Sequence, residues 1–198
     1  MMQLRNSERM QTVRHLWRYG RGCCARTDGS QIVELAVSLP LMMVMMVGIV
    51  DFGQAFNLKH KLETATREAA RFASNQSSND LTNPAPPSVD AVREVMHNYL
   101  MAAEIDDCGL TAAAAAKTGL AWTYAANTGC PGTLTLTIDR GDTYQTTGGT
   151  PVTVEATRIT ISYPFQWRFN RIIKLVAPAA NYAGLTQINA DATMQNLD

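Results

Sequence analysis

This sequence of 198 residues lacks the motifs that carry most enzymatic chemistry. It has no G-x-S-x-G nucleophile elbow, no G-x-x-x-x-G-K-[ST] phosphate loop and no G-x-G-x-x-G fingerprint. Its histidines, His15, His60 and His97, never have the H-x-H or H-x-x-x-H spacing from which a zinc site is read. An isolated acidic pair, Asp106 and Asp107, is typical of a solvated loop. We therefore expect no enzyme activity, no cofactor and no metal.

Cysteine is scarce, and its four positions fall into two pairs. Cys23 and Cys24 lie near the N-terminus, Cys108 and Cys130 lie in the C-terminal body, and no C-x-x-C is present. Cys23 follows an Arg-Gly pair rather than an apolar stretch, which argues against lipoprotein acylation. If the body is exported, Cys108 and Cys130 can form a disulfide whose loop of roughly 23 residues stabilises the fold by ~3 kcal/mol. Two free, half-buried thiols are the alternative.

Charge is absent from residues 35–50, which read LAVSLPLMMVMMVGIV. A helix of this length measures about 24 Å, slightly less than the ~30 Å hydrocarbon core of a bilayer, so a span would include flanking residues such as Ile32 and Phe52. Glu34 lies at the edge of the run, where entering lipid costs about 1–3 kcal/mol. A carboxylate retained at this position suggests that a partner charge neutralises it.

The net charge of zero conceals an asymmetry. Residues 1–29 contain six arginines and two acidic residues, a balance of +4, and the remainder carries −4. The positive-inside rule therefore places the N-terminus in the cytoplasm and the body outside. A basic segment can also bind nucleic acid, but this one has no helix-turn-helix, finger or aromatic platform, so we expect no nucleic-acid partner.

Helical spacing of apolar residues continues beyond the charge-free run, which predicts one long helix over residues 30–74, first transmembrane and then amphipathic. Its amphipathic stripe comprises Phe52, Phe56, Leu62, Ala65, Ala69, Phe72 and Ala73. Residues 74–87, rich in Asn, Ser and Pro, predict a loop. Ser88 is the predicted cap of a second helix that extends to about Glu104. We interpret His97, beside the apolar stripe of that helix, as a packing residue rather than a ligand.

Alternating apolar and polar residues predict strands at 122–125, 133–139, 152–163 and 186–195. The phase of the third strand changes near Thr157 and Arg158, which indicates a bulge. Residues 141–151 are expected to form a hairpin loop, residues 112–116 a short helical turn or flexible loop, and residues 165–177 a short helix or loop containing Trp167 and Phe169. The predicted fold is α+β, with two helices against a small antiparallel sheet. Its parts are a leader at 1–29, the long helix at 30–74 and an extracytoplasmic domain at 75–198.

The residues around Glu34 resemble a known processing site. Counting from Ser30, Glu34 is the fifth residue, and GSQIVE resembles the site at which a prepilin peptidase cuts type IV prepilins and pseudopilins after glycine. More narrowly, residues 29–73 resemble the TadE-like proteins of tight-adherence (Flp-type) pilus systems. The matching positions are Gly29, Val33, Glu34, Ala36, Pro40, Asp51, Phe52, Gly53 and residues 65–71.

This resemblance implies a single-pass minor pilin or pseudopilin of the bacterial inner membrane or the assembled pilus. Its implied partners are the membrane, other pilins, the pilus assembly platform with its secretion ATPase, and a prepilin peptidase. Cleavage is implied between Gly29 and Ser30, and Glu34 is expected to pair with the new Ser30 amine of a neighbouring chain. The competing hypothesis is an exported soluble adhesin or binding module with residues 1–55 as its secretory signal, since residues 53–55 are a small-x-small cleavage candidate.

Overall fold

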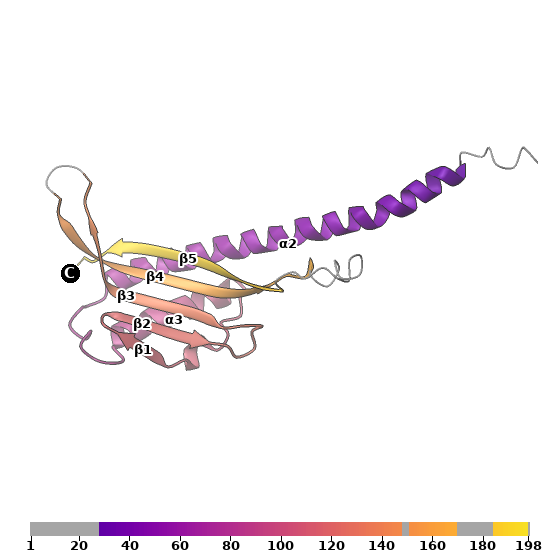
Figure 1. The fold of residues 1–198 in the computed structure, drawn as a ribbon. Helices are drawn as coiled ribbons and strands as arrows, with labels where there is room; N and C mark the ends of the chain where they lie inside the picture. The colour runs from indigo at the N-terminus through magenta and orange to yellow at the C-terminus, as the bar shows by residue number, and fades with distance from the viewer. Residues whose placement is uncertain (1–27, 148–150, 170–183, 198) are drawn as a thin grey trace, which may run out of the picture. The chain divides into compact units, whose positions relative to one another are not determined.

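A computed structural model describes residues 28–147, 151–169 and 184–197 of the chain, and residues 1–27 of the predicted leader (1–29) lie outside them. The described elements confirm the α+β fold: α2 (Asp28–Ser74), α3 (Pro87–Ala102), the short 3-10 helix η1 (Leu110–Ala112), β1 (Ala115–Thr118), β2 (Ala121–Ala126), β3 (Leu134–Gln145), β4 (Thr153–Gln166) and β5 (Leu185–Gln195) (Figure 1). The chain divides into two compact units, Met1–Met46 and Val47–Asp198. The second unit contains the sheet, α3 and the C-terminal part of α2, and we refer to it as the body.

The sheet is an antiparallel meander in the order β1-β2-β3-β4-β5, so each strand pairs with the next in the sequence. The register aligns the buried side chains in rows across the strands. One row is formed by Trp122, Ile138, Ile159 and Ala192, and the next by Tyr124, Leu136, Ile161 and Ala190. Because successive side chains of a strand point to opposite faces, these rows give the sheet one apolar face.

Both helices of the body lie against that apolar face (Figure 1). From α2 the fully or nearly fully buried apolar residues are Leu62, Ala65, Ala69, Ala70 and Ala73, and from α3 they are Val89, Val92, Met96 and Leu100. Alanine at three- and four-residue spacing keeps the surface of α2 low, which allows its backbone to approach the sheet. The amphipathic stripe therefore packs as predicted from Leu62 onward.

Two members of the predicted stripe do not join this core. Phe52 and Phe56 are 59% and 63% exposed, so the expectation that they pack on the sheet is wrong. Helical periodicity identifies an apolar face of a helix. It does not show whether that face packs on the protein's own core or contacts another apolar environment.

The start of α3 also differs from the prediction. Pro87 occupies the first turn, where its fixed φ suits a helix and its missing N–H is no loss, so Pro86 becomes the cap residue instead of Ser88. Asp80 from the preceding loop accepts hydrogen bonds from the Ser88 N–H at 2.8 Å and the Ser88 hydroxyl at 2.7 Å. Although burial alone raises it, these bonds hold the pKa of Asp80 below its usual value.

The sheet extends further than its alternation predicts. The strand β3 continues to Gln145, so its last residues belong to the hairpin ladder and the loop is shorter than expected. The register shifts opposite Thr157, where a bulge is predicted, but the additional residue lies in β3, between Asp139 and Asp142. There Arg140 turns inward and donates to the backbone carbonyls of Ala73 and Gln76, at the end of α2. Residues 112–116 end η1 and begin β1, a strand that the alanine run does not predict.

Candidate functional site

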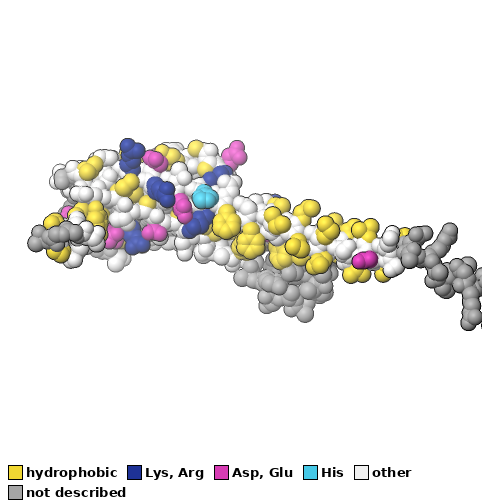
Figure 2. Space-filling model, turned by 90° about the horizontal axis from the view of Figure 1, so that it is seen from above, with side chains coloured by type: hydrophobic (Ala, Val, Ile, Leu, Met, Phe, Trp, Pro, Cys, Tyr) yellow, Lys and Arg dark blue, Asp and Glu magenta, His cyan; other side chains and the backbone are white. Residues whose placement is uncertain are grey.

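The N-terminal part of α2 exposes a continuous apolar surface. Most of the large hydrophobic side chains between Ile32 and Val50 are exposed, with fractions from 49% at Leu39 to 71% at Ile49. Figure 2 shows hydrophobic side chains along the helix, whereas Lys, Arg, Asp and Glu gather over the body. Within the described residues, α2 from Gly29 to Ser74 is the helix long and apolar enough to cross a membrane. Such a surface is stable in lipid or against other apolar helices, not in water.

The predicted processing and assembly residues lie together at the start of this surface. Gly29 and Ser30 are in the first turn of α2, and Glu34 is exposed one turn further on. Since residues four apart share a helix face, Ser30, Glu34 and Ser38 form one line. The Ser38 hydroxyl donates to the carbonyl of Leu35 at 3.1 Å, which satisfies it within its own helix and leaves Glu34 as the polar group that faces outward.

Pro40 lies inside α2, four residues after Ala36. Its ring lacks the N–H that would bond the Ala36 carbonyl, so one backbone acceptor is freed within the apolar surface. Helices in a membrane tolerate such a proline because neighbouring helices satisfy the freed group. Glu34 and the Ala36 carbonyl thus give an otherwise apolar helix two polar features for a partner to recognise.

A second group of residues, not predicted to be a site, lies where the apolar run ends. Asp51 is only 2% exposed, and its carboxylate accepts a hydrogen bond from the backbone N–H of Phe169. Phe52 and Trp167 contact edge to face, with ring centroids 5.2 Å apart. The prediction of residues 165–177 as a short helix or loop is wrong at its start, since Phe165 and Gln166 end β4; residues 170–177 lie outside the described part.

The body also contains a pair of bonded cysteines. Cys108 and Cys130 form a disulfide across 22 positions of sequence, which cross-links the turn before η1 to the loop before β3. Asp106 and Asp107 lie in a loop as predicted, with Asp106 exposed and Asp107 partly buried, and their carboxylates accept from the backbone N–H groups of Cys108 and Gly109. They therefore build the turn that positions the disulfide.

His97 lies 2.8 Å from Asp107 through its Nδ1 atom and is partly buried on α3. Burial alone raises the pKa of Asp107, but hydrogen bonds from Gly109 and His97 bring it below its usual value. The pair joins the helix to the turn that carries the disulfide. This arrangement gives His97 a structural role, tying α3 to that turn.

Comparison with protein families finds a match to the N-terminal helix. Residues 29–71 match the family model of the TadE-like protein. We call these residues, which are similar to that family, the TadE-like segment. The match begins at the predicted processing site and ends within the buried part of α2, so the resemblance seen in the sequence is confirmed over these residues. No curated protein and no solved structure matches the chain.

The TadE-like segment contains the exposed apolar surface, Glu34 and Asp51, all of which lie on α2. This match supports a component associated with the tight-adherence pilus, and the candidate span is consistent with a membrane anchor. The body beyond residue 71 lies outside the family match.

Proposed function

We propose that this chain is a minor pilin or pseudopilin that serves as a structural or assembly component of a tight-adherence pilus or a related secretion apparatus. The observation that carries the proposal is the exposed apolar helix of the TadE-like segment, with Glu34 as its one charged residue between Asp28 and Asp51. The body folds around the other half of the same helix. The chain thus presents an assembly surface without exposing its own core.

The proposed role of Glu34 follows from cleavage between Gly29 and Ser30. The cut would create an α-amino group at the N-terminus of α2, where the helix dipole disfavours a positive charge. A carboxylate from a neighbouring helix, at the same depth in an apolar bundle, would offset both charges in a charge-assisted hydrogen bond. We propose that Glu34 supplies this carboxylate to the Ser30 amine of an adjacent pilin, with no enzymatic activity of its own.

The proposed setting is the bacterial inner membrane, which the chain crosses once with its N-terminus in the cytoplasm and residues 75–198 outside. This orientation rests on the arginines of residues 1–29. The partners in this proposal are other pilins, the assembly platform and a prepilin peptidase, which would recognise the leader.

The alternative, a soluble adhesin released by removal of residues 1–55, is less well supported. Such a cut would remove Asp51 and Phe52, which bond and pack against Phe169 and Trp167 inside the body. A body without residues 47–55 would lack the Asp51 acceptor of the Phe169 N–H and the Phe52 ring that packs on Trp167. Cell fractionation separates the two hypotheses, because an anchored protein stays with membranes or sheared fibres.

N-terminal sequencing of the membrane-extracted protein, co-expressed with a prepilin peptidase, tests the proposal. We expect the mature chain to begin at Ser30 and Gly29→Val to leave the leader attached. Gln31→Val, two positions downstream, is the matched control and should be cut normally. A mature start at any other residue sinks the processing step and with it the proposed amine partner of Glu34.

A further inference from the structure

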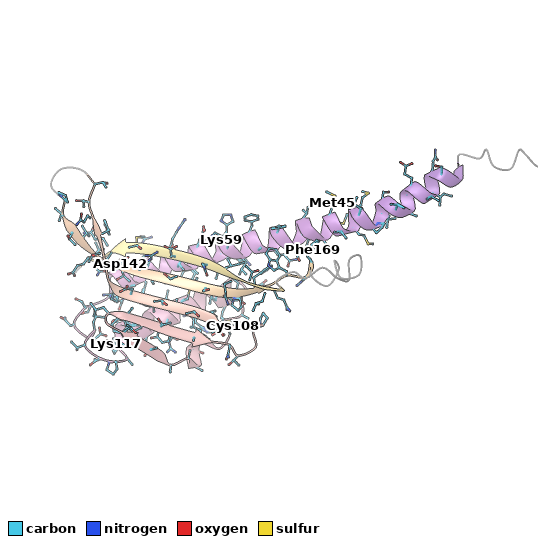
Figure 3. All side chains as sticks on the ribbon, in the orientation of Figure 1. Met45, Lys59, Cys108, Lys117, Asp142 and Phe169 are labelled. Carbon is cyan, nitrogen blue, oxygen red and sulfur yellow. A yellow bond between two sulfur atoms is a disulfide. The ribbon has the colours of Figure 1, made fainter. Side chains whose placement is uncertain are left out.

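Asp51 is a carboxylate at the end of an apolar run, yet it does not mark the end of the exposed apolar surface. It is 2% exposed, and its carboxylate accepts a hydrogen bond from the Phe169 N–H, 118 positions later in the chain. Figure 3 shows Phe169 beside α2. A carboxylate that is hydrogen-bonded and buried in this way does not contact the medium around the helix.

Residues 165–169, which we call the exit strap, contact α2 around Asp51. The Phe169 ring lies against Gly48, where an added Cβ would be 3.7 Å from it, so the helix is flat at the point of contact. Trp167 packs edge to face on Phe52 and on Phe165, with centroids 5.2 Å and 5.0 Å apart. The strap thus adds an aromatic group to the side of α2 at the level of Asp51.

The strap is also bonded to the sheet. The backbone N–H of Trp167 donates to the Gly184 carbonyl at 3.1 Å, and its indole N–H donates to the Thr186 hydroxyl at 2.7 Å. Trp167 therefore has its polar atom satisfied at the sheet and its ring turned to the helix. Arg168 between the two aromatic residues is exposed.

The exposed apolar face of α2 continues past Asp51. Ile49, Phe52 and Phe56 are spaced three and four apart and are 71%, 59% and 63% exposed, so they form one stripe. The next charged residue after Asp51 is Lys59. With Asp51 covered, the charge-free surface extends over residues 35–56, 22 residues or about 33 Å of helix.

That length resolves the shortfall of residues 35–50, which alone reach only about 24 Å of the ~30 Å core. We propose that the exit strap is a membrane-interface collar: it removes Asp51 from the lipid so that the span extends to Phe56, and it places Trp167 and Phe52 at the headgroup level. Tryptophan is enriched at this level of a bilayer, because its indole ring combines an apolar body with one polar edge. The inference rests on the membrane anchoring in the proposed function.

Depth-dependent quenching of tryptophan fluorescence tests the collar. The full chain is placed in vesicles of phosphatidylcholine and phosphatidylglycerol whose acyl chains carry bromine either near the headgroup or near the chain end. Trp17 is first replaced by Phe, and the emission lost on the further change Trp167→Phe is assigned to Trp167. Trp122, fully buried in the body, is the internal control. We expect bromine near the headgroup to quench the Trp167 emission most strongly and to leave the Trp122 emission unchanged.

Other outcomes overturn the collar and differ in what they leave standing. Unquenched Trp167 in a protein that floats with the vesicles rejects the collar, indicates that a neighbouring subunit covers the stripe, and keeps the membrane anchor. Stronger quenching from the chain end places Trp167 in the hydrocarbon and rejects the interface. Protein that does not float with vesicles rejects the anchor, the collar and the proposed function together.

A pair of Asp51 variants tests the bond that holds the strap. Asp51→Asn keeps an oxygen acceptor for the Phe169 N–H, so Trp167 quenching should match the parent. Asp51→Leu keeps the helix apolar but removes the acceptor, so quenching near the headgroup should fall. Equal quenching in both variants would show that Asp51 does not hold the strap.

Discussion

The two halves of α2 belong to one uninterrupted helix but expose opposite kinds of surface. Leu41 in the N-terminal half is 64% exposed, whereas Leu62 in the C-terminal half is 0% exposed. The N-terminal half is apolar apart from the polar residues near its start, and the C-terminal half has an apolar stripe of small residues with charges such as Lys59 and Glu63 on its other side. The same residue type therefore stabilises the body in one half and remains exposed in the other.

The largest expected difference between the halves is in folding stability. Leu62→Ala should lower the free energy of unfolding of the body by about 2–5 kcal/mol, because it leaves a cavity between α2 and the sheet. Leu41→Ala changes the same residue type outside the body and should leave that free energy unchanged. Denaturant unfolding of the full chain in detergent, followed by Trp122 emission, measures both. Similar losses in the two variants would break the proposed division of the helix.

The disulfide sharpens the same contrast, because it lies wholly in the body. Replacing both Cys108 and Cys130 by Ala should cost ~3 kcal/mol of body stability on the chain-entropy model of a loop of this length. Replacing Cys23 and Cys24 in the leader is the matched control. Vesicle flotation should be equal for both double variants, since the apolar half is unchanged. A loss of flotation in the Cys108 and Cys130 variant would contradict the independence of the halves.

The smallest expected effect on stability is at Asp80, which accepts hydrogen bonds from Ser88 in the first turn of α3. Asp80→Ala should cost about 1 kcal/mol at neutral pH, because it removes the acceptor of the Ser88 N–H and hydroxyl in the first turn of α3. The folded pKa of Asp80 is lowered, so its contribution is present above the unfolded pKa of about 3.9 and is lost as the pH falls through the folded value. The parent should therefore lose stability on acidification more steeply than the variant. Parallel pH profiles of thermal unfolding would contradict this assignment.

Much of this architecture follows from local pattern in the sequence. Three- and four-residue spacing predicts both helices, and alternation predicts the centres of four strands, because each signal needs only neighbours in the chain. The phase change at Thr157 likewise predicts the level of the register shift. It does not show which strand carries the additional residue, since that depends on Arg140 reaching the end of α2.

The exit strap is the part that sequence reasoning missed. Asp51 belongs to the motif that carries the family resemblance, but its partner is a backbone N–H 118 positions away, and a backbone group leaves no signature in a sequence. Phe52 and Phe56 have the same spacing as buried residues, so periodicity alone assigned them to the core. The Trp167 and Phe169 pair was visible as a feature, but only the fold brings it to α2.

Incorporation of a Glu34 variant into pilus fibres tests the account most directly. Glu34→Gln removes the charge and keeps the shape, and Gln31→Ala on the same exposed helix is its control. We expect Glu34→Gln to lower the amount of protein in sheared fibres about tenfold or more, the effect of losing one charged partner in an apolar bundle, with unfolding of the body unchanged. Equal incorporation of the two variants and the parent, at equal membrane levels, would contradict Glu34 as an assembly contact.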